Sequence, residues 1–189
     1  RLQLAMDHDL SVAVTNTERA IAAPGLVCDL SIGQSTLVTQ RAIANLFYRG
    51  MILRAFPVLG ETLRTSTEII GRRGLAAKPG RPPRGLVTMR IRTTGEGGRT
   101  ILDYARCAML PARTQPEVAA EGETDPRDPD LSAAALTPAF ADWNLGAFRA
   151  QVGGPHFADI AEGVTQLVGG DVVTSAPELA RLTLNLASI

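Results

Sequence analysis

One mostly apolar stretch, residues 24–40, constrains this chain more than any other, because four strand-like segments follow it with no helix between them. Its apolar residues recur at spacings of three, four and seven, which is the spacing of an α-helix; they are Leu26, Val27, Leu30, Leu37 and Val38. Ser31, Gly33 and Ser35 lie among them, and small residues let another backbone approach closely. Since a helix with apolar residues on most sides is usually buried, we expect a central helix that a sheet wraps.

The segments after the helix are rich in β-branched and aliphatic residues and are predicted to be strands, at 44–55, 61–72, 85–94 and 99–110. Glycine- and proline-rich connections separate them, at 57–60, 78–83 and 95–98. Because no helical segment intervenes, consecutive strands are expected to pair antiparallel. The sequence therefore predicts an α+β fold in which an antiparallel sheet wraps around the helix.

Composition excludes several kinds of partner. The chain carries 19 basic and 19 acidic residues, so its formal net charge is zero, and the basic residues are spread out. This pattern gives no electrostatic footprint for nucleic acid or an anionic membrane. Cys28 and Cys107 have neither a disulfide framework nor metal-ligand spacing. With no apolar run of transmembrane length and no signal peptide, a cytoplasmic protein is expected.

The composition changes after Pro111. Residues 114–137 are acidic and rich in proline, which predicts a solvated linker; an acidic docking tail is the alternative. Beyond the linker, aromatic residues at 140–148 predict a short amphipathic segment, 157–168 a strand, and the capping box at 175–178 a helix over 176–187. The pattern predicts a first unit at 1–113, which begins inside an element, and the start of a second at 138–189.

Three phrases resemble the MaoC-like dehydratase family of (R)-specific enoyl-CoA hydratases, which have the hot dog fold. The most specific is Phe-Pro-Val-Leu-Gly-Glu-Thr-Leu at 56–63, which is similar to the turn between two strands of the family's sheet. Pro24-Gly25-Leu26 resembles the start of its central helix, and 85–90 and 101–111 resemble its last two strands. The resemblance implies that 1–113 is a hot dog unit without its N-terminal strand.

Residues 157–189 resemble the opening of a second hot dog unit, which implies a double hot dog protein joined by the linker at 114–137. The alternative is that 157–189 folds back and completes the first unit. Either arrangement implies that hot dog units pair, in a homodimer or within one polypeptide.

The family interconverts 2-enoyl-CoA and 3-hydroxyacyl-CoA thioesters by adding or removing water. The resemblance therefore implies an acyl-CoA substrate, with no other cofactor and no metal. The family's Asp-x-Asn-Pro-x-His motif is absent here, and the nearest stretch offers Asp7 and His8. Neighbouring residues on a helix point about 100° apart, so the two cannot face one substrate atom together. A solvated helix end is the alternative reading of this pair.

The thioester oxygen needs hydrogen-bond donors as it gains charge. Gly25 matches the family position whose backbone N–H, at the start of the helix, supplies one, and Leu26 follows it. Alternatively, Gly25 only permits a tight turn. Asp29, within the apolar helix, is either a structural hydrogen-bonding group between subunits or an acid that lines a pocket.

A basic, proline-rich loop contains Lys78, Arg81 and Arg84, which either contact coenzyme A phosphates or are simply exposed. The resulting hypothesis is a hydratase or dehydratase in which this chain supplies the unit without the Asp/His motif. The alternatives are a non-catalytic module for acyl-thioester binding or dimerisation, and a hot dog thioesterase that uses Asp29 or Glu68.

Overall fold

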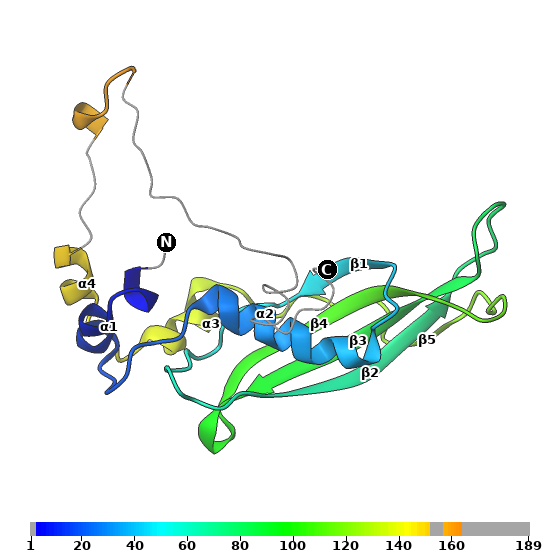
Figure 1. The fold of residues 1–189 in the computed structure, drawn as a ribbon, viewed down its shortest axis with the longest axis horizontal. Coiled ribbons are helices and arrows are strands. Elements are labelled where there is room, and N and C mark those ends of the chain that lie inside the picture. The colour runs from blue at the N-terminus through cyan, green and yellow to red at the C-terminus, as the bar shows by residue number, and fades with distance from the viewer. Residues whose placement is uncertain (1–2, 152–156, 164–189) are drawn as a thin grey trace.

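One antiparallel sheet dominates the computed structural model, which describes residues 3–151 and 157–163 (Figure 1). The strands are β1 (Ala44–Arg49), β2 (Arg64–Gly74), β3 (Arg84–Thr94), β4 (Thr100–Pro111) and β5 (Ala120–Gly122). Their spatial order is β1-β4-β3-β2-β5. The antiparallel pairing and the α+β class are confirmed, but the expectation that consecutive strands pair is wrong for the first two, because β1 pairs with β4 and not with β2. β1 also ends at Arg49 and not at residue 55, and β5 is an addition that the sequence did not predict.

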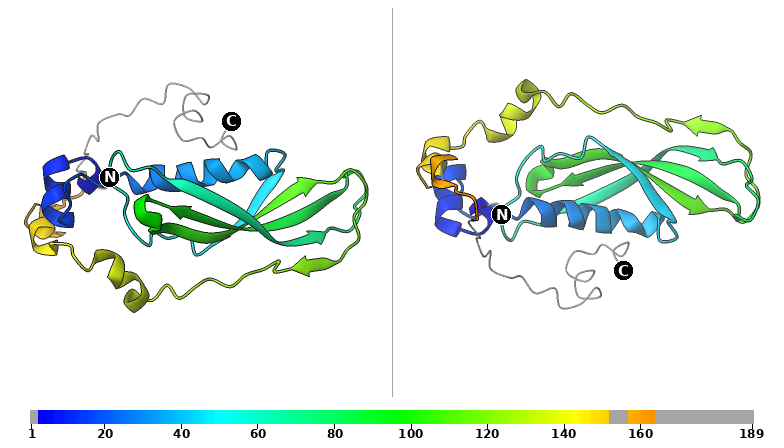
Figure 2. Two further views of the ribbon diagram at one scale, coloured as in Figure 1. Left: turned by 90° about the horizontal axis from the view of Figure 1, so that it is seen from below. Right: turned by 90° about the horizontal axis from the view of Figure 1, so that it is seen from above.

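The helix α2 (Pro24–Ser35) crosses one face of the sheet (Figure 2). It starts at the predicted proline, whose fixed φ suits the first helical position. The prediction that it continues to Gln40 is wrong. The hydroxyls of Ser35 and Thr36 donate to the carbonyls of Ile32 and Gly33, both at 2.6 Å, and the chain tightens into a 3₁₀ turn at Thr36–Val38.

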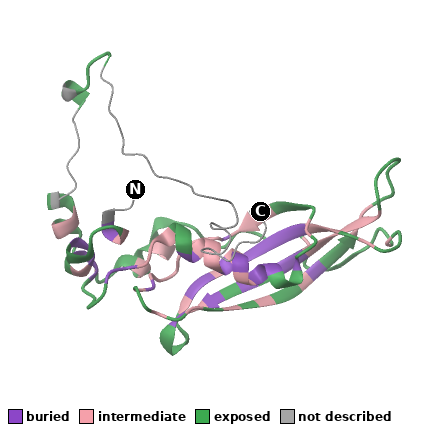
Figure 3. Ribbon diagram, viewed as in Figure 1, coloured by how far each residue is buried: buried purple, intermediate pink, exposed green. Residues whose placement is uncertain are grey.

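The main core lies between α2 and the sheet (Figure 3), and its buried members are Val27, Met89, Ile91, Ile101, Leu102, Tyr104 and Ala108. The expectation that α2 is buried on most sides is wrong, because the sheet covers one side only. Leu26 is 42% exposed and Leu37 is 74% exposed. The buried side instead carries Val27 and the small residues Ser31, Gly33 and Ser35.

A second, smaller core lies beside the start of α2. The helix α1 (His8–Thr15) follows a 3₁₀ turn at Gln3–Ala5, and α4 (Leu145–Gln151) lies against it. The cluster comprises Leu4, Leu10, Val14, Ile21, Phe56, Trp143, Ala147 and Phe148. The predicted amphipathic segment at 140–148 thus packs on the N-terminal helix of the first predicted unit. The predicted boundaries at 113 and 138 stay predictions.

The predicted linker 114–137 lies on the molecule along much of its length. After β5 pairs with β2, residues 123–129, here called the strap, cross the face of the sheet opposite α2 (Figure 2). The Thr88 hydroxyl donates to the Thr124 carbonyl at 3.0 Å, and Pro126 is buried. The helix α3 (Ala133–Leu136) and a 3₁₀ turn at Thr137–Phe140 follow.

Two predictions concern the C-terminal part of the chain. Phe157–Asp159 forms a 3₁₀ turn and residues 160–163 are in no strand, so the predicted strand at 157–168 is wrong over residues 157–163. Residues 164–168 and the predicted helix at 176–187 lie outside the described residues.

Candidate functional site

The N-terminus of α2 presents two backbone N–H groups that lack an acceptor within the helix. The N-cap is Ala23, which has no side chain that can cap, and Pro24 has no N–H. The first intrahelical bond runs from the Val27 N–H to the Ala23 carbonyl at 3.1 Å. Gly25 and Leu26 are exposed, and the space on the side chain face of Gly25 is open to at least 4 Å. The positive end of the helix dipole is therefore exposed and carries N–H groups that can donate to a partly charged oxygen.

Asp7 and His8 have other surroundings. Asp7 is the N-cap of α1, and its carboxylate accepts from the Leu10 N–H at 2.9 Å. The His8 ring lies 3.3 Å from the Asp9 carboxylate, and both side chains are exposed. The structure favours a capping role for Asp7, and no described hydrogen bond joins either residue to the start of α2.

Asp29 is half-buried on α2, one turn after Gly25. Burial raises the pKa of the neighbouring Cys28 thiol, and the Asp29 charge adds to that rise. Within the described part of the chain, Asp29 accepts no side-chain hydrogen bond that would identify it as a structural anchor.

The basic loop lies far from this helix terminus. Lys78 and Arg81 lie in the β2–β3 hairpin, at the end of the sheet opposite α1 and the start of α2 (Figure 1). Strands of this length measure roughly 35 Å, so the structure does not bring these residues to Gly25. Arg84 opens β3, and its Nε is buried without a partner among the described residues.

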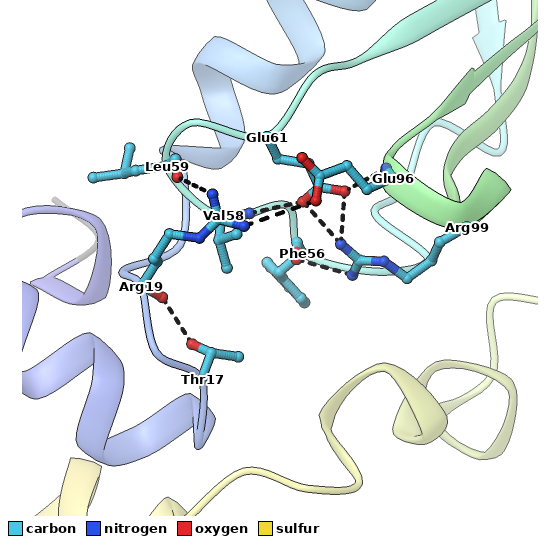
Figure 4. Close-up of polar contacts among 8 residues, drawn as sticks. All are labelled: Thr17, Arg19, Phe56, Val58, Leu59, Glu61, Glu96 and Arg99. Carbon is cyan, nitrogen blue, oxygen red and sulfur yellow. Dashed lines mark hydrogen bonds and ion pairs between the residues drawn. The ribbon is translucent and has the colours of Figure 1, made fainter.

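The turn phrase at 56–63 has a structural role that the sequence did not reveal. The side chain of Glu61 is 2% exposed and accepts from the N–H groups of Val58 at 3.0 Å and Glu96 at 2.9 Å (Figure 4). Arg99 Nη2 donates to both of its oxygens, at 3.0 and 2.9 Å. Glu61 therefore joins the connection before β2 to the β3–β4 hairpin. Burial by itself raises the pKa of Glu61, but these four hydrogen bonds together hold it below its usual value.

A polar seam lies beneath α2. Thr93 donates to Ser31 at 2.6 Å, and the Ser31 hydroxyl lies 3.2 Å from the Tyr104 hydroxyl. Burial raises the pKa of Tyr104 to about 12. Further along, the buried Arg106 donates to Ser35 Oγ at 2.9 Å and twice to Asn45 Oδ1, at 3.0 and 2.7 Å. Arg106 makes no ion pair with any described carboxylate, so helix and amide oxygens alone solvate its charge.

A largely apolar cavity of about 530 Å³ adjoins the C-terminal half of α2. Its lining includes Gly33, Gln34 and Leu37 from the helix side and Leu63 and Thr65 from the sheet side. The Gln34 side-chain oxygen is buried and has no hydrogen-bond partner among the described residues. Such a space is large enough for a small ligand.

Over residues 3–151 and 157–163, no cluster of three or more His, Cys, Asp or Glu side chains is placed to hold a metal ion. No described helix has the length and apolar character that crossing a bilayer requires.

No family model matches this sequence, and no curated protein matches it either. Among solved structures, one similar chain is a conserved hypothetical protein from Mycobacterium tuberculosis, Rv0216, which is described as essential for bacterial survival during infection and as having a double hotdog fold. The two share 47% identity over 98% of this chain, with a TM-score of 0.78. This chain belongs to the hot dog fold proteins.

Two further hot dog neighbours show the fold alone. A putative MaoC domain protein dehydratase from Chloroflexus aurantiacus is 24% identical, with a TM-score of 0.58 over 98% of this chain and 55% of its own. A monoamine oxidase regulatory protein from Archaeoglobus fulgius is 18% identical, with a TM-score of 0.50 over 60% of this chain and 74% of its own. The hot dog fold that the resemblance at the helix start and the turn phrase implied is confirmed. The chain spans 57% of the Mycobacterium tuberculosis protein.

Proposed function

We propose that this chain is the unit without the Asp/His motif of a hydratase or dehydratase that acts on 2-enoyl-CoA and 3-hydroxyacyl-CoA thioesters. The observation that carries the proposal is the start of α2, where no side chain caps the helix and Gly25 and Leu26 are exposed. In water addition to an enoyl thioester, the thioester oxygen gains enolate charge. Donors fixed in place at the positive end of a helix stabilise that charge.

The cavity of about 530 Å³ beside the second half of α2 supports an acyl substrate. Its walls at Leu37 and Leu63 are apolar, and it lies along the same helix that starts at Pro24. In this proposal the thioester binds at the helix start and the acyl chain follows the helix towards the cavity. Apolar burial there favours longer acyl chains.

Proton transfer is assigned to a second hot dog unit, because this chain lacks the Asp/His motif and no described hydrogen bond joins Asp7 or His8 to the start of α2. The exposed apolar side chains of Leu26, Leu37 and Val38 offer a surface for that unit. The second unit belongs either to the same polypeptide, as in the double hotdog protein, or to another copy. The carboxylate and histidine that it supplies would face the start of α2.

The test is a hydration assay on the full-length protein with crotonyl-CoA and longer enoyl-CoA thioesters. The loss of absorbance of the conjugated double bond measures the reaction. Gly25→Pro removes the N–H proposed to bind the oxygen, whereas Gly25→Ala keeps it and adds a methyl group into open space. We expect Gly25→Pro to lower kcat by about 100-fold or more and Gly25→Ala to remain active. Circular dichroism checks that both variants fold, and absence of turnover with every chain length excludes the proposal.

A non-catalytic acyl-thioester-binding module is the second candidate, and one observation favours it. Asp7, the residue nearest to the family motif, is used as a helix cap, and His8 points into solvent beside Asp9. This candidate predicts saturable acyl-CoA binding without water addition in the full-length protein. The further alternative, a thioesterase, is tested by Asp29→Asn and Glu68→Gln with release of free thiol as the readout.

A further inference from the structure

A cavity of about 480 Å³ lies on the outer face of the sheet, opposite α2. Its floor comes from the sheet and from Arg54 after β1, and residues of the strap form its roof. The ribbon shows the strap crossing this face of the sheet (Figure 2). Six charged side chains line it: Arg49, Arg54, Arg90, Asp103, Glu123 and Arg127. The proposed thioester site is on the other face of the sheet, so the two spaces are separate.

The roof is tied down on both sides. On the β2 side, the Glu123 N–H donates to the Ile70 carbonyl at 2.8 Å. On the β1 side, the Gly50 N–H donates to the Asp128 carboxylate at 2.9 Å, and Arg49 lies 3.7 Å from Asp125. These contacts define a built cavity between two layers of chain.

The charges that line the cavity are not all neutralised. Asp103 accepts two hydrogen bonds from Arg90, both at 2.9 Å, and also pairs with Arg92 at 3.0 Å. Arg49 pairs with the strap acids. Arg54, Arg127 and Glu123 remain, and within the described part of the chain none of the three side chains makes an ion pair or a hydrogen bond, which leaves an excess of one positive charge. Two guanidinium groups, one from the floor and one from the roof, thus line the same cavity with their donors unused.

We propose that this cavity binds a phosphorylated small molecule of about the size of a nucleoside diphosphate, held by Arg54 and Arg127. A guanidinium group can donate two parallel hydrogen bonds to two oxygens of one phosphate group. A phosphate group also carries enough negative charge to neutralise both arginines. The volume falls in the usual range for small-molecule sites. The roof excludes a macromolecule, and partial enclosure limits the screening of the charges by salt.

Isothermal titration calorimetry on the full-length protein tests the proposal with two probes, ADP and inorganic pyrophosphate, at constant ionic strength. We expect ADP to bind, and Arg54→Gln with Arg127→Gln to weaken binding at least about tenfold. Arg41→Gln with Arg113→Gln is the matched control, because it removes the same charge from exposed arginines elsewhere. Pyrophosphate binding as tight as that of ADP identifies the phosphate groups as the part recognised.

Three results would overturn the proposal. They are no binding of either probe, equal weakening of binding in the control variant, or binding that is lost when potassium chloride supplies the ionic strength. Circular dichroism verifies that each variant folds. If Arg54→Gln impairs folding, Arg127→Gln alone serves, because Arg127 is exposed on the strap. Hydration of enoyl-CoA should be unchanged in the Arg127 variant, so failure of this site and failure of the proposed thioester activity can be distinguished.

Discussion

Glu61 and Arg99 lie 38 residues apart and share two hydrogen bonds, of 3.0 and 2.9 Å, although Arg99 is largely exposed. The carboxylate of Glu61 is buried and also accepts two backbone N–H groups. Arg99 Nη1 donates in addition to the Phe56 carbonyl at 3.1 Å. Glu61 and Arg99 thus join two connections, the one before β2 and the β3–β4 hairpin, at the end of the molecule where α2 starts.

Replacing Glu61 by Gln should destabilise the protein by about 2 kcal/mol. The amide cannot accept all four hydrogen bonds, and its NH₂ group would face the N–H of Val58 or of Glu96. Urea unfolding measures the effect. Glu96→Gln is the control, since that side chain is 61% exposed and lies 3.8 Å from Arg19, so its loss should cost less than about 0.5 kcal/mol. Equal effects of the two substitutions would contradict this assignment.

The stability that Glu61 contributes should depend on pH in a defined direction. Its pKa is lowered in the folded protein, so its contribution is fully present above the ordinary glutamate value of about 4.3 and is lost as the pH falls through the folded pKa. The difference in unfolding free energy between the wild type and Glu61→Gln should therefore be constant from about pH 8 to 5 and shrink below about pH 4. A difference that grows on acidification would refute the sign.

The volume of the Arg106 side chain should matter more to the stability of the protein than its positive charge. Arg106→Ala leaves a cavity and removes the donors to Ser35 and Asn45, which should cost about 3 kcal/mol or more. Arg106→Met fills much of the space without a buried charge and should cost less. Chemical denaturation compares the two with Arg113→Ala, an exposed control. The assignment fails if the methionine variant is the less stable of the pair.

The hydroxyl of Tyr104 should lose its proton at a higher pH than an ordinary tyrosine. The chain has two tyrosines, so Tyr48→Phe leaves Tyr104 as the only phenol that absorbs. Burial raises its folded pKa to about 12, so its stabilising effect is present below about pH 10 and is lost as the pH rises towards that value. Spectrophotometric titration of the variant should show a midpoint near 12 when folded and about 10 in denaturant. A folded midpoint near 10 would disprove burial of the hydroxyl.

Gly122 should be needed to hold the strap against the sheet. Its φ of 68° favours glycine, and an added Cβ would meet the Ile70 carbonyl across the β2–β5 pairing. Gly122→Ala should cost about 1–2 kcal/mol locally and speed tryptic cleavage after Arg127. Gly97→Ala is the matched control, because its φ is 67° but its side-chain direction is open. Equal cleavage rates in both variants would show that β5 does not hold the strap.

The sequence predicted the helices and strands better than it predicted which of their side chains are buried. Pro24 marked the helix start, and the glycine- and proline-rich turns marked the connections after β2 and β3, because these residues act through local backbone geometry. The first strand was predicted to reach residue 55 but ends at Arg49, before Gly50 with its positive φ of 68°. The end of α2 was missed because the hydroxyls of Ser35 and Thr36 compete with the helix, and this depends on neighbours. Apolar spacing predicted burial of Leu26 and Leu37, but only the tertiary structure decides which side of a helix a sheet covers.

The candidate site was predicted in part. Gly25 was found because a helix start has free N–H groups in any context. The roles of Glu61 and Arg106 were missed, since each depends on partners more than thirty residues away. The outer cavity was missed for a related reason. The acidic, proline-rich composition of 114–137 predicts solvation, and only pairing of Ala120–Gly122 with β2 places the strap over the arginines.

The two edges of the sheet are not equivalent. At one edge β5 covers part of β2, and at the other β1 has no further strand beside it within the described structure. The exposed Leu46 and the preceding Ile43 give that open edge an apolar character. A partner sheet could therefore be added along β1 but would meet a short, twisted obstacle along β2. The unpaired backbone groups of β1 therefore make it the more open edge for pairing with another strand, whereas β5 protects residues 71–73 of β2 from such pairing.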